Sequence, residues 1–195
     1  VFGSFAIWQL ATYIFLHGGF FHILFNMFAL WMFGRELEGI WGTREFVRFF
    51  FVCGIGAGIS SVLVSPSSTI PTIGASGSIY GILLAYGLLF PNRELIIVPF
   101  MIPVKVKYYI MFIGGMAFFA SFSGGSGGGV AHIAHLGGMV FAYIYLRGGP
   151  YTHNFREYYD RCKRDRLRRK FEVYYNSRQK QRDRDNDDPG SRWKN

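Results

Sequence analysis

Residues 130–146 read VAHIAHLGGMVFAYIYL, an apolar run without a charged side chain that ends directly before Arg147. A helix of about 20 mostly apolar residues can cross a bilayer, so this run predicts a membrane span. The chain changes character after it, because residues 147–195 carry fifteen of the 21 Lys and Arg residues and eight of the twelve acidic residues. We therefore predict a membrane-embedded domain over residues 1–147 and a basic tail over residues 148–195.

Four more apolar runs precede this one, and all five together predict an all-α, polytopic membrane helix bundle with five visible spans. The first four spans are expected at residues 20–33 (extended at either end), 46–64, 76–90 and 108–122.

The few basic residues of the first 146 are unevenly distributed. All six lie in or directly beside the linkers 34–45 and 91–107, and the segments on the other side carry none. Because Lys and Arg accumulate in cytoplasmic loops, we expect the N-terminal segment outside and the basic tail in the cytosol. Short Gly-rich loops and the lack of an evident targeting segment favour a multi-pass protein of a bacterial plasma membrane.

Residues 74–77 read GASG and place the hydroxyl of Ser76 at the outer start of the third predicted span. Flanking glycines allow a tight turn, and the free N–H groups at a helix N-terminus favour a developing negative charge. Small residues also form helix contact faces in membranes, and Gly77 and Gly81 have the required spacing. The motif alone is compatible with a nucleophile and with a packing face.

The last predicted span carries two imidazoles, His132 and His135, which are three residues apart and share one side of a helix. His135 is about six residues from the outer linker, or roughly 9 Å, and Ser76 lies at a similar shallow depth. Gly137 and Gly138 give this helix a small face that can approach the Ser76 helix closely. We therefore expect Ser76 beside His135, although a membrane histidine can also serve as an interhelical hydrogen-bonding group.

Two further polar residues, His22 and Asn26, are four apart near the outer start of the first predicted span, so their side chains share a face. They can join helices by hydrogen bonds, or they can donate to an oxyanion. A serine needs a base such as histidine to become a nucleophile, and no carboxylate is available on the outer side. Any hydrolase here would use a Ser–His dyad, with the oxyanion held by the Ser76 N–H, His22 and Asn26.

The motifs and intramembrane carboxylates that the first 146 residues lack argue against other membrane functions. There is no H-E-x-x-H motif for a metalloprotease, no Asp before Asp160 for an aspartyl protease, and no intramembrane carboxylate for a proton-coupled transporter. Four histidines could form a zinc site, namely His17, His22, His132 and His135. Such a site would leave the Ser76 hydroxyl without a role, so we expect no metal and no cofactor.

The basic tail is expected to be solvated, with attraction to anionic lipid headgroups as an alternative. No fold motif in it indicates binding to nucleic acid.

In their order along the chain, these residues resemble the rhomboid family of intramembrane serine proteases. The resemblance covers residues 8–146 and depends on four motifs in order: His22-x-x-x-Asn26, Gly74-x-Ser76-Gly77 with Tyr80 one turn on, the Gly-rich span face, and Ala134-His135-x-Gly-Gly138. It implies that Ser76 is the nucleophile and His135 the general base, since the family pattern places a glycine three residues after the catalytic histidine.

The resemblance further implies that His22 and Asn26 stabilise the oxyanion and that Tyr80 packs on the catalytic imidazole. Three glycines would support this arrangement: Gly74, Gly77 and Gly138.

The family core has six spans, so the five found here resemble spans two to six, with the first apparently missing. The implied substrates are single-span membrane proteins, cleaved within their transmembrane segments in the lipid bilayer. A non-catalytic rhomboid-like protein that binds and guides transmembrane helices is the alternative.

Overall fold

The computed structural model describes residues 7–66, 71–97, 102–123, 128–148, 164, 167–168 and 171–182. The chain forms two compact units, Val1–Pro150 and Tyr151–Asn195, which are described separately below. The labelled elements of the first unit are, in order, α1 (Gln9–Thr12), the 3-10 helix η1 (Tyr13–Phe15), α2 (Phe20–Ala29), the π-helix η2 (Leu30–Gly34), α3 (Arg35–Trp41), α4 (Thr43–Val64), α5 (Ser76–Leu89), β1 (Glu94–Ile97), β2 (Ile102–Lys105), α6 (Val106–Ser123) and α7 (Gly128–Gly148).

Each predicted span corresponds to a helix or to a continuous helical run. The first corresponds to α2, η2 and α3 in succession, and the other four correspond to α4, α5, α6 and α7. The one single helix long and apolar enough to cross a membrane, within the described ranges, is α4, with 22 residues and a mean hydropathy of 1.9. The pair Gln9–Phe15 and Phe20–Trp41, bent by 98°, also qualifies if it is counted as one span. The number of spans therefore stays a prediction.

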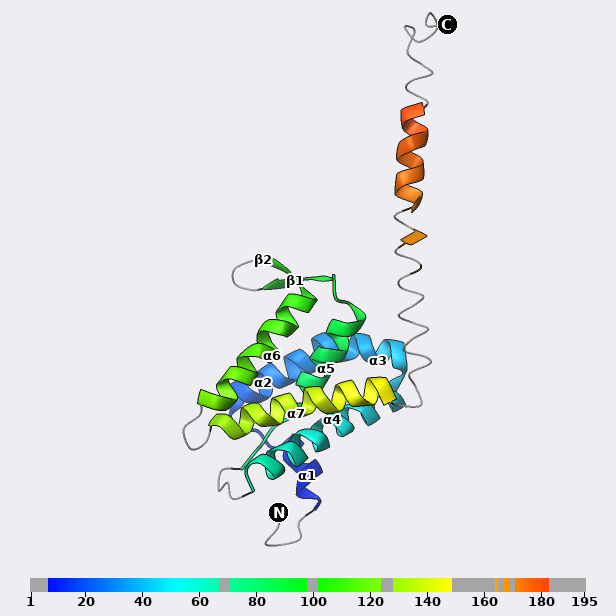
Figure 1. Ribbon diagram of the computed structural model, residues 1–195. Helices are drawn as coiled ribbons and strands as arrows, with labels where there is room; N and C mark the ends of the chain where they lie inside the picture. The colour runs from blue at the N-terminus through cyan, green and yellow to red at the C-terminus, as the bar shows by residue number, and fades with distance from the viewer. Residues whose placement is uncertain are drawn as a thin grey trace, which may run out of the picture. The chain divides into compact units, whose positions relative to one another are not determined.

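Helices α4, α5 and α7 pack side by side and form the centre of the first unit (Figure 1). Glycines permit their close approach. A Cβ atom placed on Gly138 of α7 would overlap the backbone carbonyl of Gly77 in α5. A Cβ atom on Gly81 would lie 2.6 Å from the Sγ of Cys53 in α4 and 3.2 Å from the carbonyl oxygen of Gly138. The α5 and α7 backbones are therefore in direct contact one turn below the start of α5.

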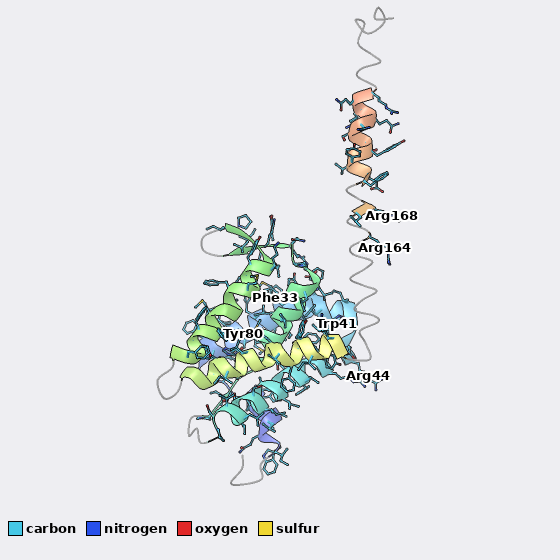
Figure 2. All side chains as sticks on the ribbon, viewed as in Figure 1. Phe33, Trp41, Arg44, Tyr80, Arg164 and Arg168 are labelled. Atoms are coloured by element: carbon cyan, nitrogen blue, oxygen red, sulfur yellow. The ribbon has the colours of Figure 1, made fainter. Side chains whose placement is uncertain are left out.

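A polar cluster joins η2, α3 and the far end of α5. The Tyr86 hydroxyl donates to Glu36 at 2.9 Å, and the Arg93 guanidinium pairs with the same carboxylate. The hydrogen bond to Glu36 raises the pKa of Arg93 above its ordinary value. Phe33 packs edge-on against Tyr86 with ring centroids 5.0 Å apart, and Figure 2 shows Phe33 inside the bundle.

The segment between α5 and α6 is more ordered than the linker expected from the sequence. Strands β1 and β2 pair antiparallel, with Glu94 opposite Lys105 and Ile96 opposite Pro103. Each strand has only four residues, and Pro103 in the second is unfavourable for a strand, which explains why the sequence did not indicate this hairpin.

Candidate active site

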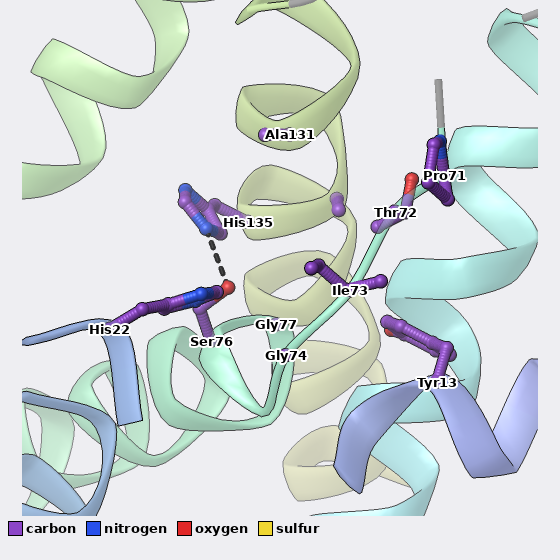
Figure 3. A pocket seen from close by; sticks show the side chains of 11 residues that line it. Tyr13, His22, Pro71, Thr72, Ile73, Gly74, Ser76, Gly77, Ala131 and His135 are labelled. Carbon is purple, nitrogen blue, oxygen red and sulfur yellow. Dashed lines mark hydrogen bonds between the residues drawn. The ribbon is translucent and has the colours of Figure 1, made fainter. Parts of the chain in front are cut away.

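The backbone before α5 has a conformation that requires glycine. Gly74 has φ of +107°, a value that residues with a Cβ rarely adopt. A Cβ atom at this position would also lie 2.8 Å from Cε1 and Nε2 of His22. The turn at Gly74 therefore lets the His22 ring approach the N-terminus of α5, where Ser76 is the first helical residue (Figure 3).

The Ser76 hydroxyl and the His135 imidazole are in hydrogen-bonding contact. Oγ of Ser76 lies 2.8 Å from Nε2 of His135, although the two residues are 59 positions apart in the chain (Figure 3). For the hydroxyl to donate, Nε2 must be unprotonated, so the proton of the neutral ring lies on Nδ1. That Nδ1 is buried and has no hydrogen-bond partner within the described part of the chain.

The His135 ring is held between two other rings. Tyr80, one turn after Ser76, stacks on it with centroids 4.2 Å apart and planes within 6° of parallel. His132, one turn earlier in α7, meets it edge-on with centroids 5.9 Å apart. These contacts restrict rotation of the imidazole, so its Nε2 stays directed at the Ser76 hydroxyl.

His22 and Asn26 bring two N–H donors to the turn before Ser76. The backbone N–H of Gly18 donates to Nδ1 of His22 at 3.3 Å, which places the neutral ring's own proton on Nε2, next to Gly74. Asn26 is 6% exposed, and its Nδ2 donates one hydrogen to the His22 carbonyl at 2.9 Å. The second N–H of Asn26 remains for another acceptor, and its nitrogen lies 3.7 Å from where a Gly74 Cβ would be.

A cavity of about 180 Å³ adjoins the Ser76 hydroxyl. Residues from five parts of the chain line it (Figure 3): Tyr13, His22, Pro71, Thr72, Ile73, Gly74, Ser76, Gly77, Ala131, Ala134 and His135. The lining combines apolar residues with the hydroxyl of Ser76 and the imidazoles of His22 and His135, which suits a site that orients a ligand by a few polar groups.

Tyr13 is a site residue that the sequence did not indicate. Its hydroxyl donates to the Gly54 carbonyl in α4 at 2.6 Å, and its own carbonyl accepts the Gly74 N–H at 3.0 Å. No periodic pattern connects it with residues 41 and 61 positions away.

His17 lies beside His22 and away from the Ser76–His135 pair. The His17 ring meets the His22 ring edge-on with centroids 5.2 Å apart, on the side of η1. Across the described ranges, no group of three or more His, Cys, Asp or Glu side chains is placed to hold a metal ion.

Comparison with known families identifies the domain. Residues 4–149 match the family model described as the Rhomboid domain, which is three quarters of the chain. The chain belongs to the rhomboid family. As a rhomboid it is a multi-pass integral membrane protein, and the predicted all-α helical membrane bundle is confirmed. Family membership indicates a rhomboid-type function and points to an intramembrane serine protease.

Rhomboid relatives come from fungi, bacteria and plants. The chain is 29% identical over 135 residues to "Rhomboid protein 1, mitochondrial" of Saccharomyces cerevisiae, covering 67% of this chain and 38% of that protein. It is 33% identical over 135 residues to "Rhomboid protease GluP" of Bacillus subtilis, covering 68% and 24%. It is 28% identical over 160 residues to "RHOMBOID-like protein 4" of Arabidopsis thaliana, covering 77% and 40%. The matches span between about a quarter and two fifths of these relatives' own lengths.

Proposed function

We propose that this rhomboid is a serine endopeptidase that cleaves transmembrane segments of single-span membrane proteins through a Ser76–His135 dyad. The observation that carries the proposal is the 2.8 Å contact between the Ser76 Oγ and the His135 Nε2. A serine and a base within hydrogen-bonding distance form the minimal unit of nucleophilic catalysis.

The dyad accounts for both halves of peptide hydrolysis. His135 takes the hydroxyl proton on Nε2 while the Ser76 oxygen attacks the scissile carbonyl carbon. The imidazolium then gives this proton to the leaving amine as the C–N bond breaks, which leaves an acyl ester on Ser76. A water molecule, deprotonated by the same nitrogen, hydrolyses the ester and regenerates the hydroxyl.

Three N–H groups are available for the negative oxygen of the tetrahedral intermediate. The Ser76 N–H lies at the first turn of α5, where backbone donors have no helical partner. Nε2 of His22 and the second N–H of Asn26 face the adjoining turn at Gly74. We assign these two side chains as oxyanion donors, each worth about 10²–10³ in rate.

We assign to Tyr80 part of the role that the acidic residue has in a Ser–His–Asp catalytic triad. After proton transfer the His135 ring is positively charged, and its Nδ1 has no acceptor in the described ranges. The parallel ring of Tyr80, 4.2 Å away, offers its electron-rich face to that cation. We therefore assign Tyr80 two roles, orienting the base and stabilising the imidazolium.

We further propose a bacterial plasma-membrane location, residues 1–147 as the catalytic domain and residues 148–195 as a cytosolic tail. The distribution of basic residues supports the cytosolic side for the tail. In this orientation Ser76 lies near the outer surface. Substrate helices would be cleaved near the membrane surface, where water can reach the acyl ester.

The proposal is tested with the full chain in proteoliposomes and a fluorescently labelled single-span substrate. We expect cleavage by the wild type and none by Ser76→Ala. The matched control is Ser121→Ala, the same change in α6, where the hydroxyl only bonds the Phe118 carbonyl. Equal cleavage by wild type and Ser76→Ala would refute the proposal. Substrate binding without cleavage by the wild type would instead select the non-catalytic alternative.

A further inference from the structure

The helix over residues 171–182 in the second unit has two chemically different faces. Five exposed residues follow the i, i+3, i+4, i+7 and i+11 spacing that puts side chains on one helix face: Phe171, Tyr174, Tyr175, Arg178 and Arg182. The other side has no aromatic residue and carries mostly polar side chains, together with one valine and one lysine: Glu172, Val173, Asn176, Ser177, Gln179, Lys180 and Gln181. Figure 2 shows the side chains of this helix projecting outward.

Contacts within the helix hold the first of these faces together, and we name it the aromatic–arginine face. The Phe171 and Tyr175 rings stack with centroids 6.4 Å apart and planes 19° from parallel. The Arg178 guanidinium lies 5.4 Å from the centroid of the Tyr174 ring.

Three described residues before this helix have the spacing of the same face. Arg164, Leu167 and Arg168 are exposed and helical, and they lie seven, four and three residues before Phe171. Together with the aromatic–arginine face of residues 171–182, these described residues supply one aliphatic side chain, three aromatic side chains and four arginines.

Positive charge is concentrated in this segment. Residues 161–182 contain ten Lys and Arg and two acidic residues, a net charge of +8. The next six residues, 183–188, contain four Asp and one Arg, a net charge of −3. Residues 161–182 therefore suit an anionic partner, whereas residues 183–188 do not.

We propose that the aromatic–arginine face binds the anionic headgroups of the bilayer in which the first unit is embedded. Tyrosine and phenylalanine rings are favourable at the headgroup level, and Arg residues attract anionic lipids. Only 15 residues lie between Gly148, the end of α7, and Arg164. Even fully extended, this connection spans at most about 55 Å, so the helix is kept near a membrane surface at high effective concentration.

The experiment measures the position of this helix with spin labels on the full chain in lipid nanodiscs. Single cysteines are introduced as Tyr175→Cys on the aromatic–arginine face and Asn176→Cys on the other side. Both carry Cys162→Ser, and the remaining Cys53 is buried. We expect the label at residue 175 to lose access to a water-soluble nickel quencher in phosphatidylcholine–phosphatidylglycerol discs. The label at 176 should stay accessible, and both should be accessible in pure phosphatidylcholine.

Two charge variants separate a specific face from total charge. The first changes Arg164, Arg168, Arg178 and Arg182 to Gln. The charge-matched control changes Arg166, Arg169, Lys170 and Lys180, whose spacing from Phe171 is not that of the same face. Each cation near an anionic surface contributes about five-fold to binding. We expect the first variant to lower the lipid-bound fraction more than ten-fold relative to the control. Size-exclusion chromatography should show that both variants remain folded.

Three results would overturn the proposal. These are equal quencher access at residues 175 and 176, equal protection in neutral and anionic discs, and equal losses in the two charge variants. A face that binds nucleic acid or a soluble protein in place of lipid would give the first of these patterns. Because none of the measurements depends on cleavage, the proposal can fail while the proposed protease activity stands.

Discussion

The contact between Gly77 and Gly138 predicts that a single methyl group can separate the proposed nucleophile from its base. A Cβ on Gly138 would overlap the Gly77 carbonyl, whereas an ordinary van der Waals contact needs at least 3.4 Å. In Gly138→Ala, α5 and α7 must therefore move apart by about 1 Å or more. The Ser76–His135 distance of 2.8 Å would then exceed hydrogen-bonding range.

The expected cost has two parts. Overpacking of this kind destabilises a protein by about 1–3 kcal/mol. A misplacement of about 1 Å in a reacting pair costs about 10²-fold in rate. We therefore expect Gly138→Ala to unfold at lower temperature in detergent and to lose about 10²-fold in kcat, with KM nearly unchanged because the cavity lining is retained.

The matched control is Gly115→Ala in α6. A Cβ there meets nothing within 4 Å, so the same change should leave activity unchanged and stabilise the helix slightly. The measurements are thermal unfolding and steady-state cleavage of a single-span substrate for both variants. Unchanged kcat in Gly138→Ala would show that the close approach of α5 and α7 does not position the dyad, and the reasoning would be wrong.

Three further predictions concern the surroundings of the dyad. Gly74→Ala should abolish activity and lower thermal stability, because φ is +107° there and the new Cβ would lie 2.8 Å from the His22 ring. Adding His22→Ala should restore part of the thermal stability but no activity. Tyr80→Ala should lower kcat about three- to thirty-fold through loss of a cation–π contact, whereas Tyr80→Phe should keep most of it; equal kcat values for the two would contradict this role. Asn26→Ala should lower kcat about 10²–10³-fold while fluorophosphonate still labels Ser76, and a change confined to KM would argue against oxyanion binding.

Much of the helical framework follows from the sequence because membrane helices are long apolar runs. The boundaries of α4 and α5, for example, are within three residues of the expected spans. The proximity of Ser76 to His135 could be expected from depth and from small residues, since glycine faces determine which membrane helices approach closely. Their catalytic roles stay predictions.

Other parts of the site depend on contacts that no local pattern encodes. The tautomer of the His22 ring follows from the hydrogen bond that the Gly18 N–H donates to Nδ1, which requires the bend between η1 and α2. The position of Tyr13 in the cavity wall depends on Gly54 in a different helix. The span count is equally hard to derive, because α5 has only 14 residues and its ends depend on neighbouring segments.

Tyr13 makes the position of Ser76 sensitive to η1, a part of the chain that contains none of the proposed reacting groups. Its hydroxyl is fixed to α4 and its carbonyl to Gly74, two residues ahead of Ser76. A force applied to η1 would therefore be transmitted through one residue to the proposed active site. Fusion partners placed before η1 would be mechanical perturbations of that site, and cleavage assays with and without them would not be interchangeable.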